Sequence, residues 1–222
     1  MSALRQVIRS AMTAALPRRR FLVRGPGSSP QVALTFDDGP HPEHTPRLLD
    51  ELARQDIKAT FFVVGREAER HPEIVERVAR EGHAIGHHSW THSEPAETPA
   101  AQLLDEVRRS IELLQSITGK VPDRFRPPKG ALTAQKFAAL WRAKQRIVLW
   151  SADPRDYQMT GPGELVSWAA SRSPSGGEIV LLHDVWPYAA AAIDSFADWR
   201  DRNPRLEFVT LDAWLPAEAS AR

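Results

Sequence analysis

Short β-branched or aromatic runs alternate with amphipathic helical stretches along most of this chain. Seven runs have the length and composition of strands, and each is bounded by Gly, Pro, Asp or Ser: residues 32–36, 59–64, 84–88, 124–127, 147–152, 179–183 and 208–211. Strict alternation of strand and helix implies parallel strands joined by right-handed crossovers. The pattern therefore predicts a doubly wound sheet or a barrel, and by itself it does not choose between the two.

The clearest predicted helix carries Leu, Val and Ile side chains on one face between positions 103 and 114. Gly119 is placed to end this helix, because glycine readily adopts the left-handed conformation found after helices. Thr98 suits the N-cap of the same helix, and Thr133 suits that of a later one.

The length of 222 residues fits one sizeable core rather than two catalytic domains. We expect a basic N-terminal segment over residues 1–27, helical or frayed, then a single catalytic domain over 28–216 and a tail over 217–222. Apolar residues at helical spacing in the first segment leave open an amphipathic helix on a membrane, although a short surface helix is the simpler interpretation. No run is long enough for an export signal or a membrane span, which favours a cytoplasmic location.

Charge and cysteine content narrow the chemistry. The 29 basic and 28 acidic residues nearly cancel, so the chain has no field of one sign to hold a nucleic-acid backbone, and nucleic acid is not an expected partner. Cysteine is absent from the sequence, which excludes disulfides and thiolate ligands. Histidine and carboxylates remain as the strong metal-binding side chains.

Polar segments follow five of the seven predicted strands, at residues 37–40, 87–92, 127–130, 153–156 and 183–184. In a doubly wound sheet or a barrel of parallel strands, the loops at the carboxyl ends of the strands converge. These five segments are therefore predicted to meet in one active site.

Three residues of these segments are candidate metal ligands: Asp38, His88 and His92. Two imidazoles suit Zn²⁺ and its neighbours, and a carboxylate completes a three-ligand site that leaves positions for water. Taken alone, an Asp-Asp-Gly-Pro segment is typical of a turn, and two histidines at this spacing are often structural. Their common placement after strands of one sheet favours the metal site.

Two further pairs of residues suggest proton transfer. His183 ends a very apolar run, where burial would keep the ring neutral unless a carboxylate such as Asp156 holds its proton. Arg126 lies just before two prolines, where a buried guanidinium needs a carboxylate, and Asp37 is the obvious partner. Asp37 would then be an ionised base. The alternatives are that His183 is a hydrogen-bonded histidine of the core and that Arg126 is directed to the surface.

The order of these segments resembles that of the polysaccharide deacetylase (NodB homology) family, carbohydrate esterase family four. The similarity runs from about Gln31 to Trp214 and rests on five motifs in family order, TFDDGP, HSWTH, RPP, DPRDY and LLHD, at residues 35–40, 88–92, 126–128, 153–157 and 181–184. What the resemblance implies is a single-domain, distorted (β/α)7 barrel that acts as a metal-dependent hydrolase.

The resemblance also implies roles for the residues of these motifs. Its metal ligands would be Asp38, His88 and His92, with zinc as the first choice of divalent cation and cobalt or nickel as alternatives.

In the same scheme Asp37 would be the catalytic base and Arg126 would orient it. His183 would protonate the leaving amine, with Asp156 tuning its pKa. The tuning role of Asp156 comes from the family and not from spacing.

Substrate contacts follow from the resemblance in the same way. The backbone N–H of Lys129 would help to bind the oxyanion, and Leu181 would line the pocket for the acetyl methyl group. Trp90, Tyr157 and Trp186 are candidates for contacting sugar rings, although tryptophans at strand ends are more often core.

Three positions depart from the family pattern. His87 replaces a common asparagine, and we expect it to support the metal ligands rather than join them. Lys129 replaces an aromatic residue, which affects glycan preference more than hydrolysis. Tyr157 in place of tryptophan is a milder change.

The expected activity is removal of N-acetyl groups from an acetylated amino-sugar glycan such as peptidoglycan, a chitin-like polymer or an exopolysaccharide. N-deacetylation is preferred over O-deacetylation of a glycan such as xylan because it dominates among family members. A cytoplasmic deacetylase of a small or lipid-linked sugar is a further alternative, since family members commonly work outside the cytoplasm but this chain shows no export signal. Alternatives from other functional classes are a metal-dependent phosphoester hydrolase and a carbohydrate-binding domain without enzymatic activity.

Overall fold

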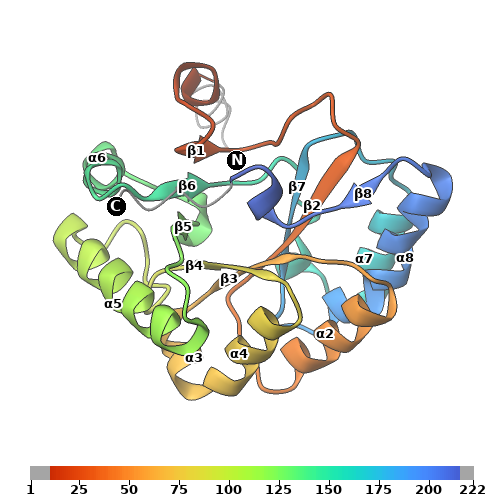
Figure 1. Cartoon of the computed structure of the whole chain (residues 1–222), viewed down its shortest axis with the longest axis horizontal. Coiled ribbons are helices and arrows are strands. Elements are labelled where there is room, and N and C mark those ends of the chain that lie inside the picture. Colours follow the sequence, from red (N-terminus) through yellow and green to blue (C-terminus); the bar gives the residue numbers. More distant parts are fainter. Residues whose placement is uncertain (1–10, 216–222) are drawn as a thin grey trace.

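In the computed structural model, which describes residues 11–215, parallel strands form one sheet with helices packed around its outer side (Figure 1). Eight strands follow the chain as β1 Phe21–Leu22, β2 Gln31–Asp37, β3 Thr60–Val63, β4 Ala84–His87, β5 Arg124–Phe125, β6 Arg146–Val148, β7 Glu178–His183 and β8 Glu207–Phe208. Their order in the sheet is β1-β6-β5-β4-β3-β2-β7, and β8 pairs with the start of β2.

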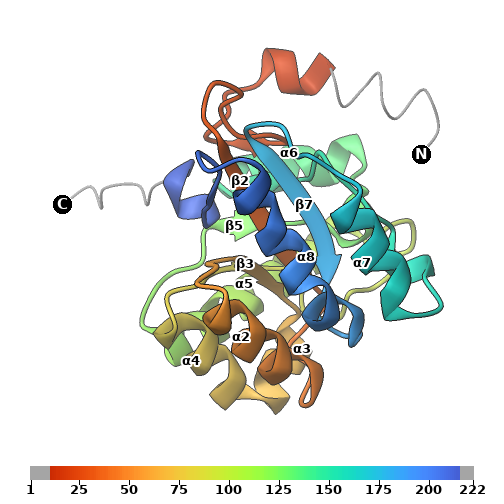
Figure 2. The same cartoon turned by 90° about the vertical axis from the view of Figure 1, so that its right-hand side faces the viewer.

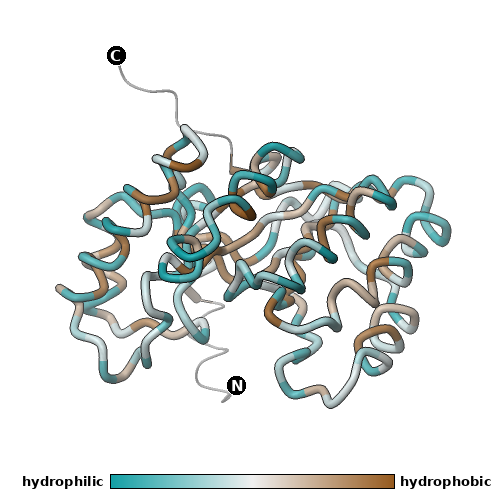
Figure 3. The backbone as a smooth tube through the Cα atoms, turned by 90° about the horizontal axis from the view of Figure 1, so that it is seen from below, coloured by the Kyte–Doolittle hydropathy of each residue, from teal (hydrophilic) through white to brown (hydrophobic). Residues whose placement is uncertain are grey.

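The helices alternate with the strands, as the sequence pattern predicted. They are α2 His44–Arg54, α3 Gly65–Arg70, α4 Pro72–Arg80, α5 Ala100–Thr118, α6 Ala134–Arg142, α7 Pro162–Ala170 and α8 Tyr188–Arg202, with single 3₁₀ turns η1 Pro128–Gly130, η2 Asp156–Gln158 and η3 Leu211–Ala213. Hydrophilic and hydrophobic stretches alternate along them (Figure 3), as expected for helices with one buried face. Within residues 11–215, no helix is both long and apolar enough to cross a membrane.

The sheet curves until its far ends approach each other. β7 pairs with β2 along Val32–Asp37, and the two strands lie side by side beneath α8 (Figure 2). On its other side β7 forms a parallel bridge between Val180 and Ala152, just after β6, and the N–H of Leu181 donates to Ala152 at 3.0 Å. The predicted α/β fold of parallel strands in a single domain is confirmed, and the curvature is that of a distorted barrel.

Strand alternation divides the buried residues into two clusters. In β2, Val32, Leu34 and Phe36 pack in the cluster beneath α2 and α8, whereas Ala33 belongs to the cluster on the other side of the sheet. β7 alternates in the same way. The last inward position of β2 is Asp37 and that of β7 is His183, and these two polar residues begin the candidate site.

One strand was not predicted. Phe21 and Leu22 form β1 beside β6, and both are buried within the segment expected to be helical or frayed. Met12 and Leu16 pack against the same cluster. The expected boundary between residues 27 and 28 therefore falls in an exposed loop between two strands of the same sheet, and the packed structure begins before it. A two-residue strand leaves no periodicity to recognise. Most of the predicted amphipathic helix lies in residues 1–10, outside the described residues.

The helix-end predictions had mixed outcomes. Gly119 ends α5 with a φ of 71°, and the Thr133 hydroxyl accepts the N–H of Lys136 at the start of α6, as predicted. The prediction for Thr98 is wrong: the N-cap of α5 is Pro99, and the Thr98 hydroxyl donates to the carbonyl of Glu94 at 2.9 Å. The first turn of α5 has no side-chain cap, because proline at the N-cap position carries no acceptor in its side chain.

Candidate active site and metal centre

The polar ends of β2, β4 and β7 converge at the carboxyl edge of the sheet, as predicted. In the register of β2 and β7, Thr35 lies opposite Leu181 and Asp37 lies opposite His183. All four positions are on the inner side of the curved sheet, because side chains alternate along each strand. Two potential proton-transfer groups are thus placed next to each other by adjacent strands.

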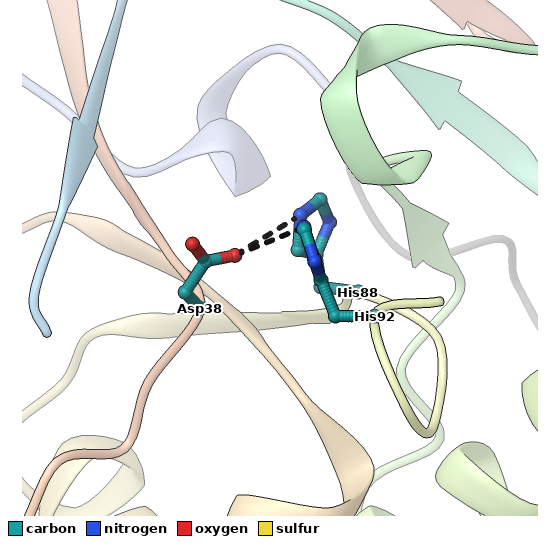
Figure 4. A group of neighbouring side chains, drawn as sticks. All are labelled: Asp38, His88 and His92. Carbon is teal, nitrogen blue, oxygen red and sulfur yellow. Dashed lines mark ion pairs between the residues drawn. The ribbon is translucent and has the colours of Figure 1, made fainter. Parts of the chain in front are cut away.

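Asp38, His88 and His92 direct three ligand atoms at one point (Figure 4). Oδ1 of Asp38 lies 3.4 Å from Nε2 of His88 and 3.3 Å from Nε2 of His92, and the three atoms are within 4.8 Å of one another. Asp38 has a φ of 77°, which turns its carboxylate away from the line of β2 towards the two rings. The structure brings all three predicted ligands together.

The protonation of these groups fits a bound cation. Nδ1 of His88 lies 2.6 Å from the carbonyl oxygen of Arg126, to which it donates its hydrogen, so Nε2 carries the lone pair. Burial lowers the pKa of His88 to about 3, which keeps the ring neutral. A lone pair facing a carboxylate is unfavourable unless a cation lies between them, and among residues 11–215 no donor hydrogen-bonds to the buried Oδ1 of Asp38.

The spacing of the ligand atoms also fits. Tetrahedral zinc sites with N and O ligands at about 2.0–2.1 Å place neighbouring ligand atoms about 3.3 Å apart. The two distances from Asp38 Oδ1 to the imidazole nitrogens match that spacing. Two imidazoles and one carboxylate suit zinc, cobalt or nickel better than magnesium or calcium, because magnesium and calcium prefer oxygen ligands alone.

Asp37 and Arg126 form a buried ion pair beside these ligands. Arg126 Nη1 donates to Asp37 Oδ1 at 2.7 Å and to the Thr35 hydroxyl at 2.8 Å. The Arg126 side chain is fully buried, and the Asp37 side chain is 3% exposed. Burial raises the pKa of Asp37, and the charge of Arg126 opposes that rise. Asp37 Oδ2 is left directed towards the metal site, 3.8 Å from Nε2 of His88.

His183 and Asp156 form a second buried pair. Nδ1 of His183 lies 2.7 Å from Asp156 Oδ1, and the His183 backbone N–H donates to Asp156 Oδ2 at 2.8 Å. Burial alone would lower the pKa of His183, but the hydrogen bond and charge of Asp156, with the charges of Asp37 and Asp38, outweigh it and raise this pKa to about 9. The ring is therefore protonated at neutral pH, and the proposed proton donor is charged.

The predicted substrate residues fall into two groups. Leu181 is buried beneath the site, and Tyr157 and Trp186 are among the few exposed large apolar side chains. Tyr157 meets the ring of His183 edge-on at 5.5 Å. Lys129 has a φ of 54° in η1, and its side chain forms an ion pair with Glu94 in the loop after His92.

The expectation that Trp90 contacts a sugar ring is not supported by its position. Trp90 is 6% exposed, and the guanidinium of Arg109 covers its ring at 3.5 Å from the centroid. A Cβ at Gly65 would lie 2.5 Å from the ring, so the start of α3 packs directly on it. Trp90 is a core residue between α3 and α5, as tryptophans at strand ends often are.

His87 lies apart from the metal ligands. Its Nε2 is 2.9 Å from Gln145 Oε1, and its ring packs against Phe125 with centroids 5.1 Å apart. Burial lowers the pKa of His87 to about 4. Its carbonyl oxygen accepts the N–H of Arg126 at 3.1 Å, so its link to the site runs through the backbone.

Two buried carboxylates beneath the site were not assigned roles from the sequence. Asp184 accepts a 2.6 Å hydrogen bond from the Thr45 hydroxyl and packs so closely on Gly39 that a Cβ there would lie 2.1 Å from its Oδ2. Burial raises the pKa of Asp184 to about 7. The second carboxylate is Glu106, on the buried face of α5. In the sequence, the sign of its burial is that Glu106 lies three residues after Leu103, on the apolar face of the predicted helix.

Comparisons with known proteins identify relatives of this chain. The family model described as polysaccharide deacetylase matches residues 24–148. The chain is 34% identical over 182 residues to the peptidoglycan-N-acetylglucosamine deacetylase PgdA of Listeria monocytogenes, a match that covers 82% of this chain but only 38% of that protein. It is 37% identical over 177 residues to a chitooligosaccharide deacetylase of Bradyrhizobium sp., covering 78% of this chain and 80% of the relative.

A solved structure has the same fold. The crystal structure of the Bc1960 peptidoglycan N-acetylglucosamine deacetylase superimposes with a TM-score of 0.82 at 30% sequence identity. The superposition covers 89% of this chain and 94% of that one. The likeness therefore extends over nearly the whole fold and not only over the motifs.

Proposed function

The chain belongs to the polysaccharide deacetylase family, carbohydrate esterase family four, and from this premise we propose that it removes N-acetyl groups from an acetylated amino-sugar glycan with a divalent cation. The observation that carries the proposal is the convergence of Asp38, His88 and His92 on one point. A buried carboxylate and a protonated imidazole lie on two paired strands beside that point.

Asp38, His88 and His92 would hold the cation. A bound divalent cation polarises a carbonyl oxygen and makes water more acidic. Zinc is the proposed metal, with cobalt or nickel as alternatives. The hydrogen bond from His88 Nδ1 to the Arg126 carbonyl keeps this ring in the tautomer that ligation needs.

Asp37 would be the base that takes a proton from the attacking water. Its Oδ1 is bound by Arg126, which leaves Oδ2 as the acceptor on the side of the metal ligands. The charge of Arg126 opposes the effect of burial on the pKa of Asp37, which favours the ionised base, and its hydrogen bond holds the orientation of the carboxylate. This is the role proposed for Arg126.

His183 would donate a proton to the leaving amine nitrogen. Asp156 binds Nδ1, so Nε2 is the free donor of the protonated ring. Leu181 would contact the acetyl methyl group, the backbone N–H of Lys129 would stabilise the oxyanion, and Tyr157 and Trp186 would contact sugar rings.

The substrate class is proposed from relatives. Those described above act by their names on peptidoglycan N-acetylglucosamine and on chitooligosaccharides, and both contain N-acetylglucosamine. Because this chain spans 38% of the length of PgdA, the substrate of that whole protein is not transferred directly. An N-acetylglucosamine unit in an oligosaccharide or polymer is the shared chemistry.

Acetate release tests the proposed function. The purified protein would be given chitooligosaccharides, peptidoglycan fragments and acetylated xylan, before chelation, after chelation and after adding back Zn²⁺, Co²⁺ or Ni²⁺. We expect release from the N-acetylated substrates that is lost on chelation and restored by the added ion. Release that survives complete metal removal would contradict the mechanism, and release from xylan alone would identify an O-acetyl esterase.

The pH dependence tests the role of Asp156. His183 has a pKa of about 9 in the folded protein, so it stays protonated, and able to act as an acid, until the pH rises through that value. In Asp156→Asn the carboxylate charge is gone and only the charges of Asp37 and Asp38 still oppose the effect of burial, so the pKa of His183 falls. The alkaline limb of the kcat/KM profile is expected to move from about 9 to a lower pH.

Asp153→Asn is the matched control for this measurement. Asp153 lies in the same loop, but its carboxylate accepts the N–H of Arg155 and does not contact His183. The alkaline limb of the kcat/KM profile of Asp153→Asn should lie at the same pH as that of the wild type. An unchanged limb in Asp156→Asn would show that His183 is not the acid whose ionisation limits activity.

A further inference from the structure

The loop that carries His88 and His92 contains two residues in a backbone conformation that is unfavourable for them. Ser89 has a φ of 64° and His92 a φ of 54°, and both lie in the left-handed region that non-glycine residues avoid. The loop contains no glycine that would relieve this. Residues in such conformations persist only when the surrounding structure holds them.

The carbonyl groups of this loop are bound by the start of α3. Gly65 N–H donates to Ser89 O at 3.0 Å, and Arg66 N–H donates to Trp90 O at 3.0 Å. Inside the loop, the N–H of His92 donates to the Ser89 hydroxyl at 3.1 Å. The remaining N–H groups need a different acceptor, because this loop continues past the end of β4.

Glu106 supplies that acceptor from α5. Its Oε2 accepts the backbone N–H groups of Trp90 and Thr91, both at 3.1 Å, and its Oε1 accepts the Thr91 hydroxyl at 2.9 Å. Gln102, one turn earlier on the helix, donates to the same Oε1 at 3.3 Å. One carboxylate therefore binds three donors of two consecutive residues that lie between the two histidines.

The burial of Glu106 makes this arrangement specific. The residue is 6% exposed, and a charged carboxylate is tolerated at such a position only when its oxygens are well hydrogen-bonded. A small displacement of the loop would leave a buried charge without donors. Two helices thus bind the loop: α3 donates backbone N–H groups to its carbonyls, and α5 accepts its N–H groups with a carboxylate. These helices lie side by side (Figure 1).

We infer that Glu106 is a positioning residue of the metal centre, which sets the spacing of His88 and His92 through the backbone between them. It touches neither imidazole, so it acts on metal affinity without being a ligand. The inference rests on the proposed function only in taking the two histidines as metal ligands. Residues that orient metal ligands typically change metal affinity by about 10–100-fold when they are altered.

Metal affinity without substrate is the direct test. Zn²⁺ would be titrated into metal-free wild type and Glu106→Gln in competition with a coloured chelator, and the visible spectrum of each Co²⁺ complex would be recorded. The amide keeps the size of the side chain but places an NH₂ group against N–H donors. We expect Zn²⁺ binding weakened by about 10–100-fold and an altered Co²⁺ band, with binding restored at high Zn²⁺.

Glu112→Gln is the control on the same helix. Glu112 is exposed and pairs with Arg108, so its substitution should leave the Zn²⁺ affinity and the Co²⁺ spectrum unchanged. If Glu106→Gln does not fold, Thr91→Val removes one donor to the carboxylate and is expected to weaken Zn²⁺ binding several-fold. Wild-type affinity in a folded Glu106→Gln, or in Thr91→Val where the first variant fails, would overturn the inference.

The two proposals fail separately. If wild type binds Zn²⁺ but releases no acetate from any substrate, the proposed function fails while the effect of Glu106 on affinity still stands. If wild type releases acetate and Glu106→Gln binds Zn²⁺ normally, only the positioning role is lost.

Discussion

Asp37→Asn is expected to lower kcat for acetate release by about 10²–10⁴-fold while Zn²⁺ remains bound. The amide has nearly the shape of the carboxylate and can still accept the hydrogen bond from Arg126 at Oδ1. It cannot take a proton from water at neutral pH. Paired measurements of turnover and of Zn²⁺ content per protein molecule check this result.

Asp38→Asn is the neighbouring variant for comparison. Asp38 Oδ1 faces both imidazoles, so loss of its charge should weaken Zn²⁺ binding itself. Loss of metal in Asp37→Asn together with its retention in Asp38→Asn would reverse the assignment of the two carboxylates.

Arg126→Met is expected to cause the largest loss of stability, about 3–5 kcal/mol in the free energy of unfolding. The side chain is fully buried, and it binds Asp37, Thr35 and the carbonyl of Leu149 at the centre of the sheet. Methionine fills much of the space but leaves the Asp37 carboxylate buried without its counter-charge. Urea unfolding at neutral pH in the presence of a chelator measures the loss in the metal-free protein.

The double variant Arg126→Met with Asp37→Asn separates charge from packing. If the unpaired carboxylate causes most of the loss, the neutral amide should recover part of it, and the two effects should not add. Additive losses would show that Arg126 stabilises the protein chiefly by its packing on Phe62, over whose ring the guanidinium lies at 4.1 Å from the centroid.

The sequence predicted best where periodicity and strand ends coincide. The inward positions of β2 and β7 end in Asp37 and His183, and alternation along an apolar strand is visible without a structure. The ion pair of Asp37 with Arg126 was predicted from the high cost of burying a guanidinium without a counter-charge. This physical constraint does not depend on the fold.

Residues whose role depends on packing across elements could not be assigned in this way. Trp90 follows a strand and precedes a proposed ligand, yet the approach of α3 at Gly65 decides that it is buried. Glu106 is distant from the motifs in sequence and reaches the loop only because α5 packs beside it. β1 is too short to show alternation, and its pairing with β6 is a tertiary contact.

The register of β2 and β7 has a consequence for how a protein of this kind can change. Adjacent strands lie about 4.8 Å apart, a distance set by backbone hydrogen bonds. Asp37 and His183 face each other across this ladder, so the separation of the two groups belongs to the backbone and not to any loop. Loops bearing the proposed substrate residues Lys129, Tyr157 or Trp186 can therefore change while the spacing of the proposed acid and base stays constant.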